Sequence, residues 1–289
     1  MTTSSVSLAT RLDDVQGMIR REPAVAGHRW TLFQLLCVTQ QWERAIQQLQ
    51  VFAQLDPQQA PAAQAYRDLI RAERWRAKVL AGLAQPGFVI EPPAWAEKLA
   101  QALRLTADGQ TEAADSVREA ALDLAPLVGG KGAAHSFEWI ADSDSRLGPV
   151  CEVITAGRYR WLPFSDIAAW EIGRPATLVD LVWAPCLLTL RDGTKARGFM
   201  PARFPGDTAH DSDRLDALRL GNTTVWTDVG RTGVIAQGRK TWTTSAGDAG
   251  LFELDVCVFA QDAGGTPQAA ATAVAAVAMA GGGDVNGAA

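Results

Sequence analysis

The stretch WERAIQQLQVFA, residues 42–53, decides the fold of the first half of the chain. Its apolar residues recur at spacings of three, four and seven, and they are Trp42, Ala45, Ile46, Leu49, Phe52 and Ala53. Because an α-helix has about 3.6 residues per turn, these residues share one face, and the polar residues between them occupy the other. The stretch therefore predicts an amphipathic helix with one buried side.

More helices are predicted on either side of this one. Upstream, WTLFQLLC (residues 30–37) carries a second apolar stripe, and only Thr39–Gln41 separates it from the first, which predicts an antiparallel helical hairpin. Downstream, a longer helix from about residue 62 to 81 is ended by Gly82 and Pro86, which are ordinary stop signals. An extended segment at 87–93 then precedes predicted helices at about 95–105 and 111–124.

The prolines of this half suggest a repeat. Pro23 and Pro57 are 34 residues apart, as are Pro92 and Pro126, and 34 residues is the tetratricopeptide (TPR) period. The closing prolines place Ala45 and Ala114 at the same repeat position, where the two helices of a repeat approach closely and a small residue is needed. Arg29 and Lys98 stand where a tryptophan is typical, so the predicted repeats are degenerate.

The second half changes to a period of two, which is typical of strands. Strands are predicted at 150–154 and 159–162 around Gly157, and at 186–190 and 195–200 around Asp192-Gly193, a strong hairpin signal. A last strand is predicted where Phe252, Leu254, Val256 and Val258 alternate with other residues, and 177–183 is predicted to form a short helix. The sequence therefore predicts an α+β protein, in which TPR-like helical hairpins precede a small β-rich domain of mixed or barrel-like form.

The glycine-rich stretch 128–134 has no periodicity and is interpreted as a linker. It gives a helical domain at 1–130 and a β-rich domain at 134–260. The residues from 261 to 289 are mostly Ala, Gly and Val without aromatic residues, so we expect a disordered tail.

Charge and composition exclude several classes of function. Residues 1–131 carry 14 basic and 14 acidic side chains, which leaves 13 basic and 18 acidic for the rest, so the acidic second half argues against nucleic acid as a partner. The first residues lack the pattern of a secretory signal and no apolar run is long enough to cross a membrane, so we expect neither a signal peptide nor a membrane span. Its four cysteines are scattered, as expected of small buried residues in a reducing compartment, and we expect a cytoplasmic protein.

The densest polar cluster is Asp142, Asp144 and Arg146, with Glu152 close behind. One interpretation is a hydrolase or metal-dependent site, with the carboxylates as acid, base or metal ligands and Arg146 binding an anion. The other, which we favour, is a structural turn in which Asp side chains accept backbone N–H groups. His28, His135 and His210 have no metal-ligand spacing, and we find no motif for nucleophilic catalysis or phosphate binding. The sequence therefore predicts no catalytic residue, metal or cofactor.

A basic stripe lies along the predicted long helix at a spacing of four, three and four residues, and it consists of Arg67, Arg71, Arg74 and Lys78. Its commoner role is a solvated helix face, and the alternative is a docking surface for an acidic partner helix. If the helical half binds a protein in a concave groove, we expect four aromatic residues near that groove and the basic stripe at its rim. These aromatic residues are Trp30, Phe33, Trp42 and Tyr66.

Several motifs together resemble the ImpE/SciE family, also called TagJ. They are WTLFQLLCV and WERAIQQLQ (30–38 and 42–50), AYRDLIRAE (65–73), FEWIADSDSRLGPVCEV (137–153), GRYRWLPF (157–164), DLVWAP (180–185) and Gln237-Gly238-Arg239. The resemblance covers nearly all of the chain up to about residue 260. The chain departs from it at Thr39-Gln40, where a small residue and glycine are more usual.

The resemblance implies an accessory protein of the bacterial type VI secretion system. It implies an association with the small subunit of the contractile sheath, and through that subunit with the AAA+ ATPase that recycles the sheath. It carries no catalytic residues to transfer. We therefore expect a non-enzymatic adaptor that binds a sheath component through its helical domain, with no nucleic acid, membrane or cofactor as a partner.

Overall fold

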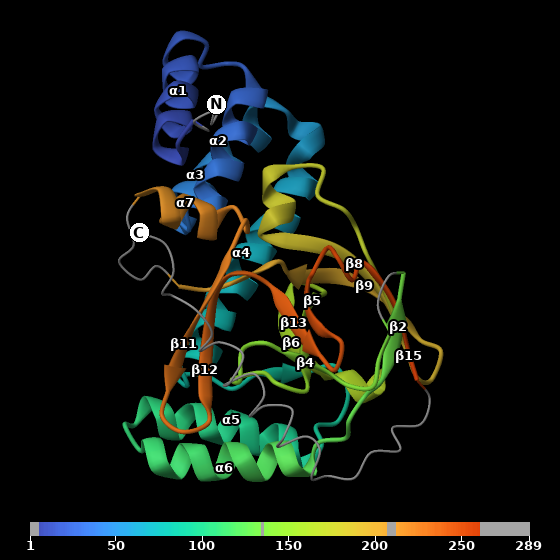
Figure 1. Ribbon diagram of the computed structural model, residues 1–289. Helices are drawn as coiled ribbons and strands as arrows, with labels where there is room; N and C mark the ends of the chain where they lie inside the picture. The colour runs from blue at the N-terminus through green and yellow to red at the C-terminus, as the bar shows by residue number, and fades with distance from the viewer. Residues whose placement is uncertain (1–5, 134–135, 207–211, 261–289) are drawn as a thin grey trace, which may run out of the picture.

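The computed structural model describes residues 6–133, 136–206 and 212–260, and the first half of the chain is helical (Figure 1). The predicted helix at 42–53 is α3 (Trp42–Leu55), and the predicted long helix is α4 (Ala60–Leu80). The other helical segments of this half are α1 (Leu8–Arg21), α2 (Ala26–Val38), the 3₁₀ turn η1 (Pro57–Gln59), α5 (Ala94–Ala107) and α6 (Thr111–Leu124). The predicted helices are therefore confirmed.

The hairpin of α2 and α3 is joined by a tight turn at the position where the chain departs from its family resemblance. Gln40 has a φ of 58°, in the left-handed region that favours glycine. The Gln41 N–H donates to the Leu36 carbonyl at 2.8 Å, which is the hydrogen bond of a Schellman helix end. The turn thus keeps its geometry with a residue other than glycine at the left-handed position.

The two helical hairpins, α2–α3 and α5–α6, do not stack on each other. The repeat predicted stacked hairpins with a concave groove, and this prediction was wrong. In Figure 1, α1 to α3 lie at one end of the molecule and α5 with α6 at the opposite end, and α4 runs between them beside the strands. The physical reason is β1 (Gly87–Phe88), which pairs with a strand of the sheet directly after α4 and so carries the chain out of the helical layer. Ala45 and Ala114 are nevertheless both buried, as close helix packing requires.

The second half forms strands, which confirms the α+β class. The strands are β2 (Gly130–Gly132), β3 (Ser136–Phe137), β4 (Ile140–Asp142), β5 (Val150–Thr155), β6 (Arg158–Pro163), β7 (Ile167–Ile172), β8 (Trp183–Leu190), β9 (Lys195–Pro201), β10 (Arg203–Phe204), β11 (Thr224–Val229), β12 (Gly233–Arg239), β13 (Thr241–Thr244), β14 (Gly247–Gly250) and β15 (Val256–Phe259). Between them lie η2 (Phe164–Asp166), η3 (Leu178–Leu181) and α7 (Ser212–Arg219).

The largest sheet has the strand order β1-β6-β5-β9-β8-β7-β15-β2-β3, and two three-stranded sheets, β10-β12-β11 and β14-β13-β4, accompany it. In the large sheet β1 and β6 are parallel and the other pairs are antiparallel. The predicted hairpins β5–β6 and β8–β9 are both present, and Gly157 and Gly193 have positive φ in their turns. A mixed sheet with β1 at one edge therefore lies against the helices.

Two local predictions in this half were wrong. Gly130–Gly132, interpreted as linker, form β2 and pair with β15 and β3, because a glycine strand fits where side chains of Leu254 and Phe137 fill the space beside it. The last strand begins only at Val256, since hydrogen bonds from Glu253 and Leu254 to Gly250 turn the chain before it. Val256 and Val258 are exposed, and Cys257 and Phe259 face the core instead.

The hydrophobic core crosses from the helices to the strands. One continuous cluster joins residues of α1 to α6 to Leu147, Val150, Trp161 and Trp183 of the β-rich half. A second cluster lies within the sheets and contains Trp170 and Trp242, whose rings stack at 5.4 Å. All four cysteines are free and buried, as predicted.

No helix in the described ranges combines the length and the apolar character needed to cross a membrane. His135, His210 and the predicted tail at 261–289 lie outside the described residues.

Candidate functional site

Helix α4 has two faces with different chemistry. Its inner face carries Glu73 and Arg76, which are buried against the strands. Its outer face carries Arg71, Arg74 and Lys78, which are exposed. The helix therefore links a buried ionic network to a basic surface.

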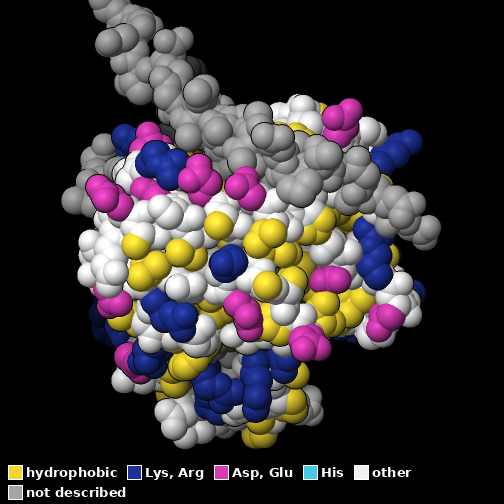
Figure 2. Space-filling view, turned by 90° about the horizontal axis from the view of Figure 1, so that it is seen from below, with side chains coloured by type: hydrophobic (Ala, Val, Ile, Leu, Met, Phe, Trp, Pro, Cys, Tyr) yellow, Lys and Arg dark blue, Asp and Glu magenta, His cyan; other side chains and the backbone are white. Residues whose placement is uncertain are grey.

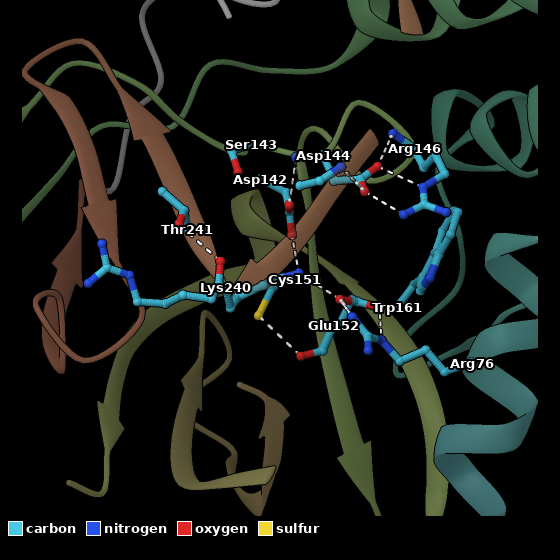
Figure 3. Close-up of polar contacts among 12 residues, drawn as sticks. Arg76, Asp142, Ser143, Asp144, Arg146, Cys151, Glu152, Trp161, Lys240 and Thr241 are labelled. Atoms are coloured by element: carbon cyan, nitrogen blue, oxygen red, sulfur yellow. Dashed lines mark hydrogen bonds and ion pairs between the residues drawn. The ribbon is translucent and has the colours of Figure 1, made fainter. Parts of the chain in front are cut away.

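The buried network is centred on Glu152 of β5 (Figure 3). Arg76 donates to both of its carboxylate oxygens, from Nε to Oε1 at 2.7 Å and from Nη2 to Oε2 at 2.8 Å. The same guanidinium donates to Glu73 Oε1 at 2.9 Å, and the Tyr159 hydroxyl donates to Glu152 Oε1 at 2.7 Å. Because Arg76 and Glu152 are buried, this two-pronged pair fixes α4 to the sheet at one register.

Lys240, at the junction of β12 and β13, completes the network from the other side. Its Nζ lies 2.6 Å from Glu152 Oε2 and also contacts the carboxylate of Asp142. The ammonium lies over the ring of Phe204, 4.7 Å from its centroid, and 5.3 Å from that of Trp242. A fully buried ammonium is thus stabilised by two carboxylates and two aromatic faces.

The two carboxylates differ in their proton affinity. Burial and, to a smaller extent, the charges of Glu152 and Asp144 raise the pKa of Asp142 to about 7, against the opposing effect of Lys240. Burial acts on Glu152 in the same direction, but the charges of Arg76 and Lys240 outweigh it and hold its pKa well below the usual range. Below about pH 7, where Asp142 is protonated, the negative charges of Glu73 and Glu152 balance the positive charges of Arg76 and Lys240; above it, Asp142 adds a second carboxylate charge beside Lys240.

The predicted Asp-rich turn has the geometry expected of a structural motif. Asp142 Oδ1 accepts the Asp144 N–H at 2.9 Å, and Asp144 Oδ1 accepts the Arg146 N–H at 3.0 Å, as Asx turns do. Arg146 pairs with Asp144, whose second oxygen accepts the Ala236 N–H of β12 at 3.0 Å. The turn is therefore fixed to its neighbouring strand.

The same burial argues against the alternative hydrolase or metal site. Asp142, Asp144 and Glu152 are only 2%, 0% and 1% exposed, so a substrate has no direct contact with their oxygens. Within the described ranges, no group of three or more His, Cys, Asp or Glu side chains is arranged to hold a metal ion. These carboxylates are instead paired with Arg76, Arg146 and Lys240.

The four aromatic residues predicted near a groove separate into two places. Trp30, Phe33 and Tyr66 contact one another with ring centroids 5.0 to 5.2 Å apart, in a cluster between α2 and α4. Trp42 instead packs on Trp183 of β8, 5.8 Å away. Phe33 is fully buried and can only shape the surface from beneath, whereas the other three are partly exposed.

The predicted basic stripe is on the surface of α4 and is partly paired. Arg71 lies 2.9 Å from Asp68, and Arg74 lies 2.8 Å from Glu43 of α3, with the arginine side chains 69% and 53% exposed. Exposed pairs of this kind contribute little to stability. Their arginines therefore stay accessible to another molecule.

A pocket beside this stripe was not predicted from the sequence. Its volume is about 390 Å³, and it lies between α4, the segment Gln85–Gly87 and the β5–β6 turn, with Arg71, Trp75 and Arg158 in its lining. Trp75 is 46% exposed. The sequence held one signal for it, because Trp75 is four residues after Arg71 and so places a large aromatic ring on the basic face.

Arg76 and Lys240 were also missed. Their shared partner Glu152 is 76 and 88 residues away in sequence, so no local pattern could connect them.

Comparisons with known proteins agree with this architecture. The ImpE protein family model matches residues 134–258. The type VI secretion system accessory component TagJ of Pseudomonas aeruginosa is 42% identical over 250 residues, which are 85% of this chain and 86% of that protein. A protein of Vibrio parahaemolyticus with a crystal structure has a TM-score of 0.80 and 24% identity, covering 88% of this chain and 94% of its own, and shows the same fold. As its motifs predicted, the chain belongs to the ImpE family, which includes the type VI secretion accessory component TagJ.

Proposed function

We propose that this protein is a non-enzymatic adaptor of the type VI secretion system, which binds the small subunit of the contractile sheath through its helical half. Through that subunit it would act together with the AAA+ ATPase that recycles the sheath, in the cytoplasm. The observation that carries the proposal is the outer face of α4, where an exposed tryptophan and basic side chains border an open pocket. Tryptophan and arginine are the residues most enriched among those that dominate protein–protein binding energies.

The buried network supports the non-enzymatic part of the proposal. Its charged side chains are paired with one another, and these pairs hold α4 against the sheet. Their role is therefore structural. A rigid helix is a suitable platform for binding, because little ordering entropy is lost when the partner docks.

Calorimetric titration of the small sheath subunit into the full chain tests the proposal. We expect saturable binding with a dissociation constant on the order of 1 μM or tighter. The large sheath subunit and the ATPase, titrated separately, are the matched comparisons, and the ATPase is expected to bind only in the presence of the small subunit. Absence of binding to every sheath component would contradict the proposal.

A further inference from the structure

We propose that the pocket between α4 and the β5–β6 turn, defined here as the α4 pocket, binds an acidic segment of a protein partner and takes one of its apolar side chains against Trp75. The inference rests on the proposed function and gives it a location and a partner chemistry. Three observations carry it: the shape of the pocket, the fixed position of its walls and the charge around it.

The α4 pocket is suited to one large side chain. Its volume of about 390 Å³ is within the range of small ligand sites, and its lining includes Ala72, Trp75, Pro86 and the floor residue Tyr159. It is open to solvent, and the Arg71 side chain in its lining is exposed. A leucine, phenylalanine or tryptophan side chain would remove the Trp75 ring from water there, which is favourable by the hydrophobic effect.

The walls of the pocket are held in place by contacts beneath them. The Trp75 indole Nε1–H donates to the Gln85 carbonyl at 3.2 Å, which orients its ring. Tyr159 is fixed by its hydrogen bond to Glu152. The β5–β6 turn packs so closely on α4 that a Cβ atom on Gly157 would lie 2.9 Å from the Asp68 Cβ. The pocket is therefore preformed, and binding needs little rearrangement.

The charge around the pocket favours an acidic occupant. Arg158 of the pocket lining is exposed, as is Lys78, which is outside the lining and three residues after Trp75 on α4. In the described ranges neither has an acidic side chain as an ion-pair partner. Arg71 is paired with Asp68, but 69% of its side chain is exposed. This basic surface stands out on a chain whose net charge is −5. Carboxylates flanking the apolar side chain would find complementary charges on the rim.

The basic surface continues past the pocket toward α5. A second pocket of about 490 Å³ shares Gln85 with the first and is lined by Lys98, Arg104 and one acid, Glu97. Seen from below, the molecule shows Lys and Arg side chains gathered together with hydrophobic atoms among them (Figure 2). A segment longer than one pocket would thus remain in contact with positive charge. A mixture of apolar and basic contacts favours an acidic polypeptide over a nucleic acid, which would use the charges and not the side-chain pocket.

Fluorescence anisotropy with labelled synthetic peptides tests the inference on the full chain. The probe is a 12-residue peptide of Glu and Gly around one central Trp, and the matched probes replace every Glu by Lys, or the Trp by Gly. We expect only the first to bind well. Its dissociation constant should rise at least about tenfold with Trp75→Ala and with the double variant Arg71→Glu/Arg158→Glu.

The controls separate the site from general charge effects. The double variant Arg20→Glu/Arg21→Glu makes the same charge change on exposed residues of α1 and should leave the affinity unchanged. Tight binding of the Lys peptide or of a single-stranded 12-nucleotide DNA, or binding of the Glu peptide that is unaffected by Trp75→Ala, would overturn the inference. So would the absence of binding of the Glu peptide.

Titration of the small sheath subunit into the same variants separates this inference from the proposed function. Binding of the subunit that is weakened by Trp75→Ala supports both. Equal binding to wild type and Trp75→Ala leaves the proposed function intact and overturns the α4 pocket as its site. Peptide binding in the α4 pocket without binding of any sheath component supports the pocket and contradicts the proposed function.

Discussion

At the scale of single residues, the most consequential group is the buried carboxylate of Asp142. It contacts the Lys240 ammonium, yet burial and the neighbouring charge of Glu152 raise its pKa to about 7. Its second role, accepting the Asp144 N–H, does not depend on its charge. The side chain thus combines a structural hydrogen bond with a proton that is released near neutral pH.

This proton makes stability depend on pH. The pKa of Asp142 is about 7 in the folded chain and 3.8 in an unfolded chain, so folding is favoured when Asp142 is protonated. This contribution to the free energy of unfolding is fully present below pH 3.8 and is lost as the pH rises through about 7. Glu152 acts oppositely, since its lowered pKa removes stability only as the pH falls below about 4.5. Between pH 5 and pH 8 the effect of Asp142 on stability can therefore be measured without a contribution from Glu152.

We expect Asp142→Asn to flatten the pH dependence of stability between about pH 5 and pH 8. The amide keeps an oxygen for the Asp144 N–H and cannot ionise, so the fall in the free energy of unfolding expected for the wild type should shrink. Urea unfolding at four pH values across this window measures it. Parallel pH profiles for the two proteins would show that Asp142 does not titrate there.

At the scale of secondary-structure elements, local signals predicted the helices and hairpins, while contacts distant in sequence decided which faces are buried. Trp42 to Ala53 had a complete helical pattern, and Asp192-Gly193 marked the β8–β9 turn. For β15 the even-numbered residues, among them Val256 and Val258, formed the apolar set in the sequence pattern. In the structure Cys257 and Phe259 are buried instead, because β15 lies between β7 and β2 and the orientation of those strands decides which of its faces meets the core. No residue close to β15 in sequence indicates that orientation.

The β11–β12 hairpin shows how such distant contacts fix an element. Asp115 of α6 accepts the N–H groups of Arg231 and Thr232 at 2.8 and 3.2 Å and the Thr232 hydroxyl at 2.7 Å. It also accepts from Arg118 Nη1 at 2.9 Å. Gly230 has a φ of 68° in this turn, and a Cβ atom there would lie 2.7 Å from Asp115 Oδ2. One carboxylate thus joins the hairpin to α6.

We expect Asp115→Ala to destabilise the protein by about 2–4 kcal/mol, because it removes these acceptors and leaves the buried Arg118 without its carboxylate. The matched control is Glu119→Ala, which breaks an exposed pair with Arg231 in the same turn and should have a much smaller effect. Thermal unfolding of both variants measures the difference. Equal effects would show that the hairpin is not held through Asp115.

At the scale of the whole molecule, the sequence could predict two kinds of secondary structure but not how they meet. The 34-residue spacing of prolines suggested stacked repeats, and β1 separates the two hairpins instead. No local pattern in the sequence indicates that Arg76 and Glu152 fix α4 on the sheet, which leaves the other face of the helix exposed. The helices and strands share one hydrophobic cluster, which includes Trp161 and Trp183.

This shared core predicts that the helical and β-rich halves unfold together. Circular dichroism at 222 nm, which follows the helices, and tryptophan fluorescence, which follows the rings of the strands as well, should give coincident urea transitions. Residues 1–130 alone should lack a cooperative transition, since they lose the strand side of the core. Two separate transitions, or a stable fragment, would support the predicted boundary between independent domains instead.

We propose α4 as a platform whose outer face binds a protein partner. Hydrogen–deuterium exchange of the full chain, alone and saturated with the small sheath subunit, tests it most directly. We predict slower exchange on binding in the second half of α4, in the segment Gln85–Gly87 and in the turn at Gly157–Tyr159, with little change in β11 and β12. Protection confined to the exposed face of β15 or to the β11–β12 hairpin would contradict the claim.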